Sequence, residues 1–261
     1  MKRIPHILVL FLLFSSSAFA QNIGSWDEIA VNSFGELITL SKNRSELGRF
    51  RADTLINSFT DNALGTRLSL EDPLKPIIDD PDRIHLLDMG TRSIITWDRF
   101  LNLHAITPLH EDIISPTAFT VTSEHDWLIY DEFSELIFQV HAGENYPQEW
   151  GVDILSQNIE LYALEKKVLI HERDTQTLTL CDENGVTLLQ GVFADSLNVF
   201  RVFPLTTENI VLSCEKGLFL WKPQDKDLRY LSDIKNPIYI ENLNETVFKV
   251  ITRDGEILYL P

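Results

Sequence analysis

Apolar strand patterns separated by short polar turns recur along the chain after its first twenty residues. One clear pair is Trp127–Tyr130 and Glu135–His141, which flank the polar turn Asp131–Ser134. Before this pair, Thr117–Ser123 alternates apolar and polar residues, as expected for a strand that is buried on one face. After it, Trp150–Leu155 supplies a further strand. This unit therefore predicts a sheet of four short strands.

The same unit recurs six times along the chain. The first strand of the apolar pair ends near Leu40, Leu87, Tyr130, His171, Cys214 and Thr252, so successive ends are 38 to 47 residues apart. A repeat of this length, built from short strands, is typical of a β-propeller. The sequence therefore predicts an all-β, six-bladed propeller with about four strands per blade. The last unit ends on its third strand, Glu256–Leu260, so we expect an incomplete closing blade unless Gln21–Ser25 supplies the fourth strand.

Turn chemistry supports these units. An acidic residue follows the first strand of the pair in four of them, at Asp88, Asp131, Glu172 and Glu215. A carboxylate at the start of a turn can accept hydrogen bonds from backbone N–H groups, so we expect these acids to hold the hairpins in place. A ring of metal-binding carboxylates is the alternative. Lys216–Gly217 and Asp254–Gly255 predict two-residue hairpin turns, because glycine tolerates positive φ.

The first twenty residues have the features of a secretory signal peptide. Lys2 and Arg3 precede an apolar run of eight residues, Ile7–Phe14, and Ala18 and Ala20 form a cleavage site before Gln21. The run is too short to span a bilayer. We therefore expect residues 1–20 to be a signal peptide and residues 21–261 to be one propeller domain. The mature protein is expected to be periplasmic or extracellular, without membrane insertion.

The charge of the chain narrows the choice of partners. It has 39 acidic and 22 basic residues, for a net charge of −17. Such a surface repels phosphate backbones, so a nucleic acid partner is not expected. The acids are spread along the chain, which favours a role in solubility over attraction of cationic ligands. Cys181 and Cys214 lie within apolar strands and are expected to be buried thiols rather than a disulfide.

Pro76–Ile94 contains the pattern Pro…Ile-x-x-Asp-x-Asp-x-Ile-x-x-Leu-Asp-x-x-x-x-x-Ile. It resembles six-bladed propellers of the NHL and SMP-30-like (TolB-like) type, and the repeat spacing extends this resemblance over the mature chain. SMP-30-like lactonases hold a central divalent cation and commonly begin with a Glu-Gly-Pro element. Gly24–Glu28 lacks that element, so we carry over no catalytic residue and no metal ligand. No cofactor is expected, with calcium or another divalent cation as the alternative.

Two places on the predicted loops are candidates for ligand binding. His125 lies in a turn between Glu124 and Asp126, where neighbouring carboxylates could create a pH-sensitive site. Trp150 follows a loop and could be presented to a partner, since tryptophan is frequent among the residues that dominate interfaces.

The sequence contains no nucleophile elbow and no phosphate-binding glycine loop. We therefore expect an exported, monomeric, non-enzymatic propeller that binds a protein or glycan partner through loops at one rim. The alternative is a metal-dependent hydrolase or lactonase of the SMP-30-like type, with its site in the central channel. Metal analysis of the purified protein would distinguish the two.

Overall fold

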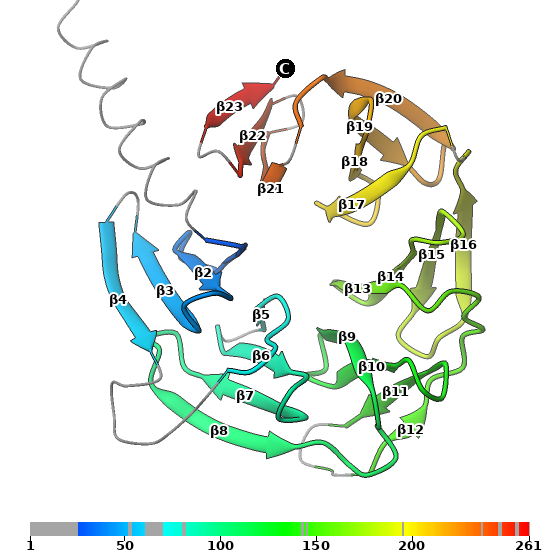
Figure 1. Ribbon diagram of the computed structural model, residues 1–261. Helices are drawn as coiled ribbons and strands as arrows, with labels where there is room; N and C mark the ends of the chain where they lie inside the picture. Colours follow the sequence, from blue (N-terminus) through cyan, green and yellow to red (C-terminus); the bar gives the residue numbers. More distant parts are fainter. Residues whose placement is uncertain are drawn as a thin grey trace, which may run out of the picture.

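The computed structural model describes residues 26–51, 54–60, 70–79, 82–141, 144, 146–194, 196–235, 237–244, 247–253 and 256–260. Six antiparallel sheets stand as blades around a central axis, which Figure 1 shows end-on. The first five blades have four strands and the last has three, which confirms the predicted all-β, six-bladed propeller. The expected signal peptide, Gln21–Ser25 and the predicted turn at 254–255 lie outside the described residues. Within the described ranges, no helix is long and apolar enough to cross a membrane.

Within every blade the strands follow chain order, from the innermost to the outermost. Blade 1 contains β1 (Glu28–Val31), β2 (Leu37–Ser41), β3 (Glu46–Arg51) and β4 (Thr54–Thr60); blade 2 contains β5 (Ile77–Ile78), β6 (Ile84–Asp88), β7 (Ser93–Trp97) and β8 (Leu103–Pro108). Blade 3 contains β9 (Pro116–Val121), β10 (Trp127–Asp131), β11 (Leu136–Val140) and β12 (Gln148–Glu149); blade 4 contains β13 (Ile159–Leu164), β14 (Lys167–Glu172), β15 (Thr177–Asp182) and β16 (Thr187–Val192). Blade 5 contains β17 (Val199–Pro204), β18 (Ile210–Cys214), β19 (Gly217–Lys222) and β20 (Asp227–Ser232); blade 6 contains β21 (Pro237–Asn244), β22 (Val247–Thr252) and β23 (Ile257–Leu260).

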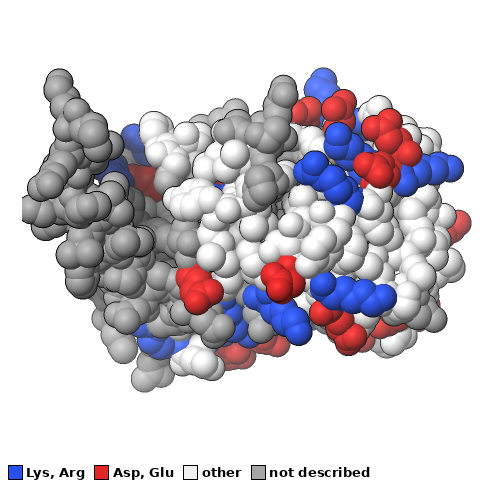
Figure 2. All heavy atoms as spheres, turned by 90° about the horizontal axis from the view of Figure 1, so that it is seen from above, with Lys and Arg blue, Asp and Glu red and all other residues white. Residues whose placement is uncertain are grey.

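The position of a strand within its blade explains its hydrophobic pattern. The second strands β2, β6 and β18 are buried along their whole length, because the adjacent blades cover both of their faces. The outermost strand β8 instead alternates between half-buried and exposed positions, because water reaches one of its faces. Figure 2 shows the edge of the ring, where acidic and basic side chains are interspersed.

Six clusters of buried apolar side chains fill the six interfaces between successive blades. The cluster between blades 6 and 1 contains Trp26 and Phe50, whose rings meet edge to face with centroids 5.7 Å apart. Ile238 and Ile251 contribute to it from blade 6. Since each buried side chain of this size contributes about 1.5–3 kcal/mol, side-chain packing closes the ring although blade 6 has three strands.

Two of the four recurring acids, Asp88 and Asp131, hold their hairpins as predicted. Asp88 accepts hydrogen bonds from the N–H of Gly90 in its own turn and from two N–H groups in the segment that leads into blade 2. Asp131 likewise bonds both its own turn and the incoming segment, and Glu172 bonds the incoming segment of blade 4. All three carboxylates therefore fix the segment that leads into a blade, and Asp88 and Asp131 also fix a turn.

Blade 5 departs from this pattern. Glu215 accepts a hydrogen bond from the side chain of Asn198 rather than from the backbone. Cys214 pairs with Gly217, so the two-residue turn lies one position before the predicted Lys216–Gly217. The φ of Gly217 is 119°, a value that glycine adopts without strain.

Both cysteines are buried and unbonded, as predicted. Burial raises the pKa of the Cys181 thiol to about 11 and that of Cys214 to about 12. The two side chains therefore act as small apolar residues of the blades.

Candidate binding sites at the two ends of the propeller

Each innermost strand runs from one end of the ring to the other, so its first and last residues lie at opposite ends. The two ends of the central channel therefore carry different residues. Glu28 begins β1, whereas Phe34 follows its last residue. We call the end that contains Glu28, Lys75, Glu160, Arg173, Arg201 and Arg253 the channel mouth. We call the opposite end, with the β1–β2, β5–β6, β7–β8 and β9–β10 turns, the rim.

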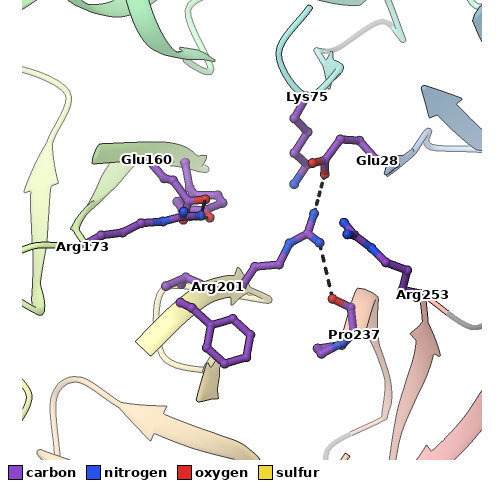
Figure 3. A pocket seen from close by; sticks show the side chains of 10 residues that line it. Glu28, Lys75, Glu160, Arg173, Arg201, Pro237 and Arg253 are labelled. Carbon is purple, nitrogen blue, oxygen red and sulfur yellow. Dashed lines mark hydrogen bonds and ion pairs between the residues drawn. The ribbon is translucent and has the colours of Figure 1, made fainter. Parts of the chain in front are cut away.

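The channel mouth is a basic cavity in an acidic protein. Its volume is about 330 Å³, and Figure 3 shows charged side chains from several blades around it. Four of the six charged residues that line it are lysine or arginine, and the other two are Glu28 and Glu160. The arrangement therefore suits an anionic ligand, although the net charge of the chain is −17.

Glu160 is the centre of one ionic cluster at the channel mouth. The hydroxyl of Tyr162 donates to it at 2.8 Å, Nδ1 of His171 lies 3.1 Å away, and Arg173 forms an ion pair with it. Burial raises the pKa of Glu160, but the hydrogen bond with His171 and the charge of Arg173 outweigh it and hold the pKa at about 2. Glu160 is therefore ionised at neutral pH and positions its neighbours instead of exchanging protons.

Arg201 crosses the channel mouth. Its guanidinium pairs with the carboxylate of Glu28 in blade 1 and donates to the carbonyl oxygen of Pro237 in blade 6 at 3.4 Å (Figure 3). One side chain of blade 5 thus joins the first and last blades. This bond adds to the apolar packing that closes the ring.

Two cations at the channel mouth have no carboxylate of their own. Among the described residues, the side chains of Lys75 and Arg253 form no hydrogen bond or ion pair; Lys75 lies 5.7 Å from the ring centroid of Tyr162. Burial lowers the pKa of Lys75, which Glu28 partly opposes. Lys75 and Arg253 therefore add positive charge to the mouth that no carboxylate among the described residues pairs with.

The rim has a second ionic cluster, centred on Asp79. The guanidinium of Arg83 donates to its Oδ2 at 3.0 and 2.7 Å, Nε2 of His85 lies 3.1 Å away and Nδ1 of His125 lies 3.3 Å away. Burial raises the pKa of Asp79, but the hydrogen bonds from His85 and Arg83 outweigh it and lower the pKa. Asp79 is therefore bonded within blade 2 and lies beside the first turn of blade 3.

The structure separates the three residues of the predicted His125 site. His125, at a positive φ of 67°, faces Asp79 of the preceding blade rather than its sequence neighbours. Glu124 is exposed. Asp126 is buried and is held by Gln139 and His141. The turn therefore brings a histidine and a carboxylate together, but the carboxylate comes from another blade.

Trp150 is not presented to a partner, contrary to the expectation from the sequence. It is 3% exposed and packs in the cluster between blades 3 and 4. Its indole N–H donates to the carbonyl oxygen of Glu183 at 2.9 Å. Burial and this bond leave Trp150 no surface with which to bind a ligand.

The rim carries an aromatic surface that the sequence analysis missed. The guanidinium of Arg99 lies between the rings of Phe34 and Phe100, 4.8 and 4.6 Å from their centroids. Phe34 is 61% exposed and Phe100 is 45% exposed. Asp82 accepts hydrogen bonds from the N–H and the hydroxyl of Ser33 at 2.8 and 2.7 Å, which joins the turns of blades 1 and 2.

A closer alignment of the six units would have indicated the channel mouth. Glu28 and Glu160 pair with Leu40 and His171, two of the strand ends that define the repeat. Charged residues thus recur at the start of innermost strands, where their side chains meet around the axis. No comparable signal places Arg99 beside Phe34, because their turns belong to different blades.

The part of the chain that the structure describes contains no group of three or more His, Cys, Asp or Glu residues placed to hold a metal ion.

Comparison with known proteins identifies the fold. No family model and no curated protein sequence matches the chain. A streptogramin B lyase structure is similar with a TM-score of 0.62 and 11% identity, over 91% of this chain and 83% of that one. An inactive virginiamycin B lyase from Staphylococcus aureus, bound to quinupristin, gives 0.60 and 10%, over 92% and 85%. The WD40 propeller domain of Doa1 gives 0.62 and 12%, over 90% and 78%. These likenesses show a six-bladed β-propeller similar to virginiamycin B lyase and WD40 propellers, and they assign no family.

Proposed function

We propose that this protein is an exported, monomeric, non-enzymatic β-propeller that binds a protein or glycan partner through its rim. The observation that carries this proposal is the stack of Phe34, Arg99 and Phe100, which is contributed by two blades and open to solvent. Arginine and aromatic side chains are enriched among the residues that dominate protein–protein affinity. The stack therefore favours a protein over a glycan.

The turns around this stack are fixed before a partner arrives. The Ser33–Asp82 hydrogen bonds join blades 1 and 2, and the Asp79–His125 contact joins blades 2 and 3. A surface that is already ordered loses less conformational entropy on binding than a mobile loop does. The three blades can therefore present a rigid docking surface.

Cross-linked capture from the cells that export the protein tests this function. The probes are the wild type, Arg99→Ala, and Phe133→Ala as a matched control, since Phe133 is 71% exposed in the β10–β11 turn at the other end of the ring. We expect wild type and F133A to capture the same identified protein, and R99A to bind it about tenfold more weakly. Absence of any partner, together with turnover of a small molecule, would contradict the proposal.

Two finer statements belong to the same proposal. The pattern in Pro76–Ile94 supports a place among propellers of the NHL or SMP-30-like type. The features of residues 1–20 support export by a cleaved signal peptide. Amino-terminal sequencing of protein purified from the exporting cell tests the second statement, because cleavage as expected leaves Gln21 as the first residue.

A further inference from the structure

We infer that the channel mouth is a second binding site, independent of the rim, and that it takes a small organic anion. The carboxylate or phosphate group of the ligand lies among Lys75, Arg201 and Arg253. Its organic part packs against Phe200 and Tyr162, which line the same cavity. No bond is made or broken, because the site binds the ligand and releases it unchanged.

The charges at the channel mouth favour an anionic ligand. Figure 3 shows Lys75, Arg201 and Arg253 directed toward one space. Arg201 has Glu28 as a counter-ion, whereas Lys75 and Arg253 have no ion pair among the described residues. Holding like charges together costs free energy, and an oxyanion placed between them offsets this cost with charge-assisted hydrogen bonds. Guanidinium groups match the geometry of carboxylates and phosphates particularly well.

The two carboxylates offset only part of this charge. Glu160 is already engaged by Arg173, His171 and Tyr162, and Glu28 is engaged by Arg201. Both acids therefore fix the positions of surrounding side chains. The cations without such partners remain available to a ligand.

The size and walls of the cavity favour an organic ligand. Its volume of about 330 Å³ exceeds the space that a bare ion occupies and falls in the range of small-molecule sites. Phe200, Tyr162 and Val202 add apolar surface beside the cations. A second cavity of about 480 Å³ shares Lys75 and Tyr162 and extends along the channel past Ile29. The ligand is therefore an organic anion rather than inorganic phosphate.

Calorimetric titration of the mature protein with matched probes tests this site. Glucuronate and glucose 6-phosphate are each compared with neutral glucose, and benzoate is compared with benzamide; these pairs distinguish a carboxylate source from a phosphate source. Inorganic phosphate serves as the bare ion. We expect at least one organic anion to bind more tightly than its neutral analogue and than inorganic phosphate, and to bind less tightly as salt is added.

Two variants locate the binding. Arg253→Ala removes a cation from the mouth, and Arg229→Ala removes an exposed cation from the outer strand β20 as a matched control. We expect R253A to weaken binding about tenfold or more, and R229A to leave it unchanged. Lys75→Gln provides a second test, with thermal unfolding used to confirm that each variant is folded.

Three results would overturn the inference. The site is ruled out if no organic anion binds more tightly than its neutral analogue. It is also ruled out if R253A and R229A bind the anion equally tightly. Inorganic phosphate binding as tightly as the organic anions removes the assigned ligand class. None of these results bears on the partner at the rim, which Arg99 tests separately.

Discussion

The two ends of the propeller each contain a cluster of ionisable side chains around one carboxylate. At each end the carboxylate contacts one arginine and one histidine. At the rim, Asp79 contacts Arg83 and His85. At the channel mouth, Glu160 contacts Arg173 and His171. Both carboxylates have lowered pKa values. In both clusters, an ionised carboxylate therefore holds neighbouring side chains in place.

The surroundings of the two clusters differ. At the rim, Glu36 neutralises both Arg49 and Arg51, and Asp82 holds a neighbouring turn. At the channel mouth, Lys75 and Arg253 have no such partner among the described residues. Internally balanced charge stabilises a fixed surface, whereas unbalanced charge is left for a ligand. The internally paired rim and the basic cavity at the mouth therefore suit different ligands.

The largest effect is expected from Glu36→Gln at the rim. Glu36 and Arg49 are both buried and joined by two hydrogen bonds of 2.8 Å. The amide leaves the buried guanidinium without a counter-ion, so we expect a loss of about 3–5 kcal/mol in the free energy of unfolding, measured by urea denaturation.

Glu46→Gln is the control for this change. Glu46 pairs with Arg44 at 3.3 Å, and Arg44 is largely exposed. A surface pair of this kind contributes about 0–1 kcal/mol. Equal losses in the two variants would show that the balanced charge at the rim does not stabilise the blade.

Acid should weaken both ends of the propeller. The hydrogen bond from Arg49 lowers the pKa of Glu36 to about 2, and Glu160 is held at about 2 against its burial. Since the folded pKa lies below the ordinary value of 4.5, the stabilisation is present above that value and is lost as the pH falls toward 2. Each group contributes up to about 3 kcal/mol.

The measurement is the free energy of unfolding between about pH 5 and pH 2. Glu160→Gln should flatten the slope of stability against pH relative to wild type, because one group no longer takes up a proton on unfolding. An unchanged slope would mean that the cluster at the channel mouth does not stabilise the fold.

A smaller effect is expected from the acids that hold the hairpins. The carboxylate of Asp88 is fully buried and accepts hydrogen bonds from three backbone N–H groups. Asp88→Asn removes its negative charge. We expect a loss of about 1–3 kcal/mol, measured by thermal unfolding. Glu215→Gln should cost less than about 0.5 kcal/mol, because Glu215 bonds an exposed side chain. The reverse order would contradict the structural role of the repeated acid.

The sequence predicts the ring of blades well, because each blade is formed by residues that are close together in the sequence. The apolar runs at β2 and β6 and the turn acid Asp88 each lie within a single repeat, and the spacing between repeats is visible along the chain. Hydrophobic periodicity and turn chemistry act over a few residues, so a single chain displays them directly. The two buried thiols are predicted for the same reason, since Cys181 and Cys214 lie inside apolar strands.

The candidate surface at the rim could not be predicted in this way, because it combines residues from different blades. The sequence places His125 between Glu124 and Asp126, yet the carboxylate that its ring faces is Asp79, from blade 2. Trp150 follows a loop in the sequence but is covered by blade 4. Contacts across blades depend on the rotation between successive sheets, which no local pattern encodes.

The smallest expected effect compares single arginines at the two ends. Arg83→Ala removes a group that donates two hydrogen bonds to buried Asp79, so it should cost about 1–2 kcal/mol. Arg253→Ala removes a cation that faces Arg201 in Figure 3 without a partner of its own among the described residues. Relief of this repulsion should leave stability unchanged or raise it by a few tenths of a kcal/mol at low salt. Urea denaturation at low and high salt measures both variants. A loss of stability in R253A equal to that in R83A would show that charge at the channel mouth is as well balanced as at the rim, and the contrast between the two ends would disappear.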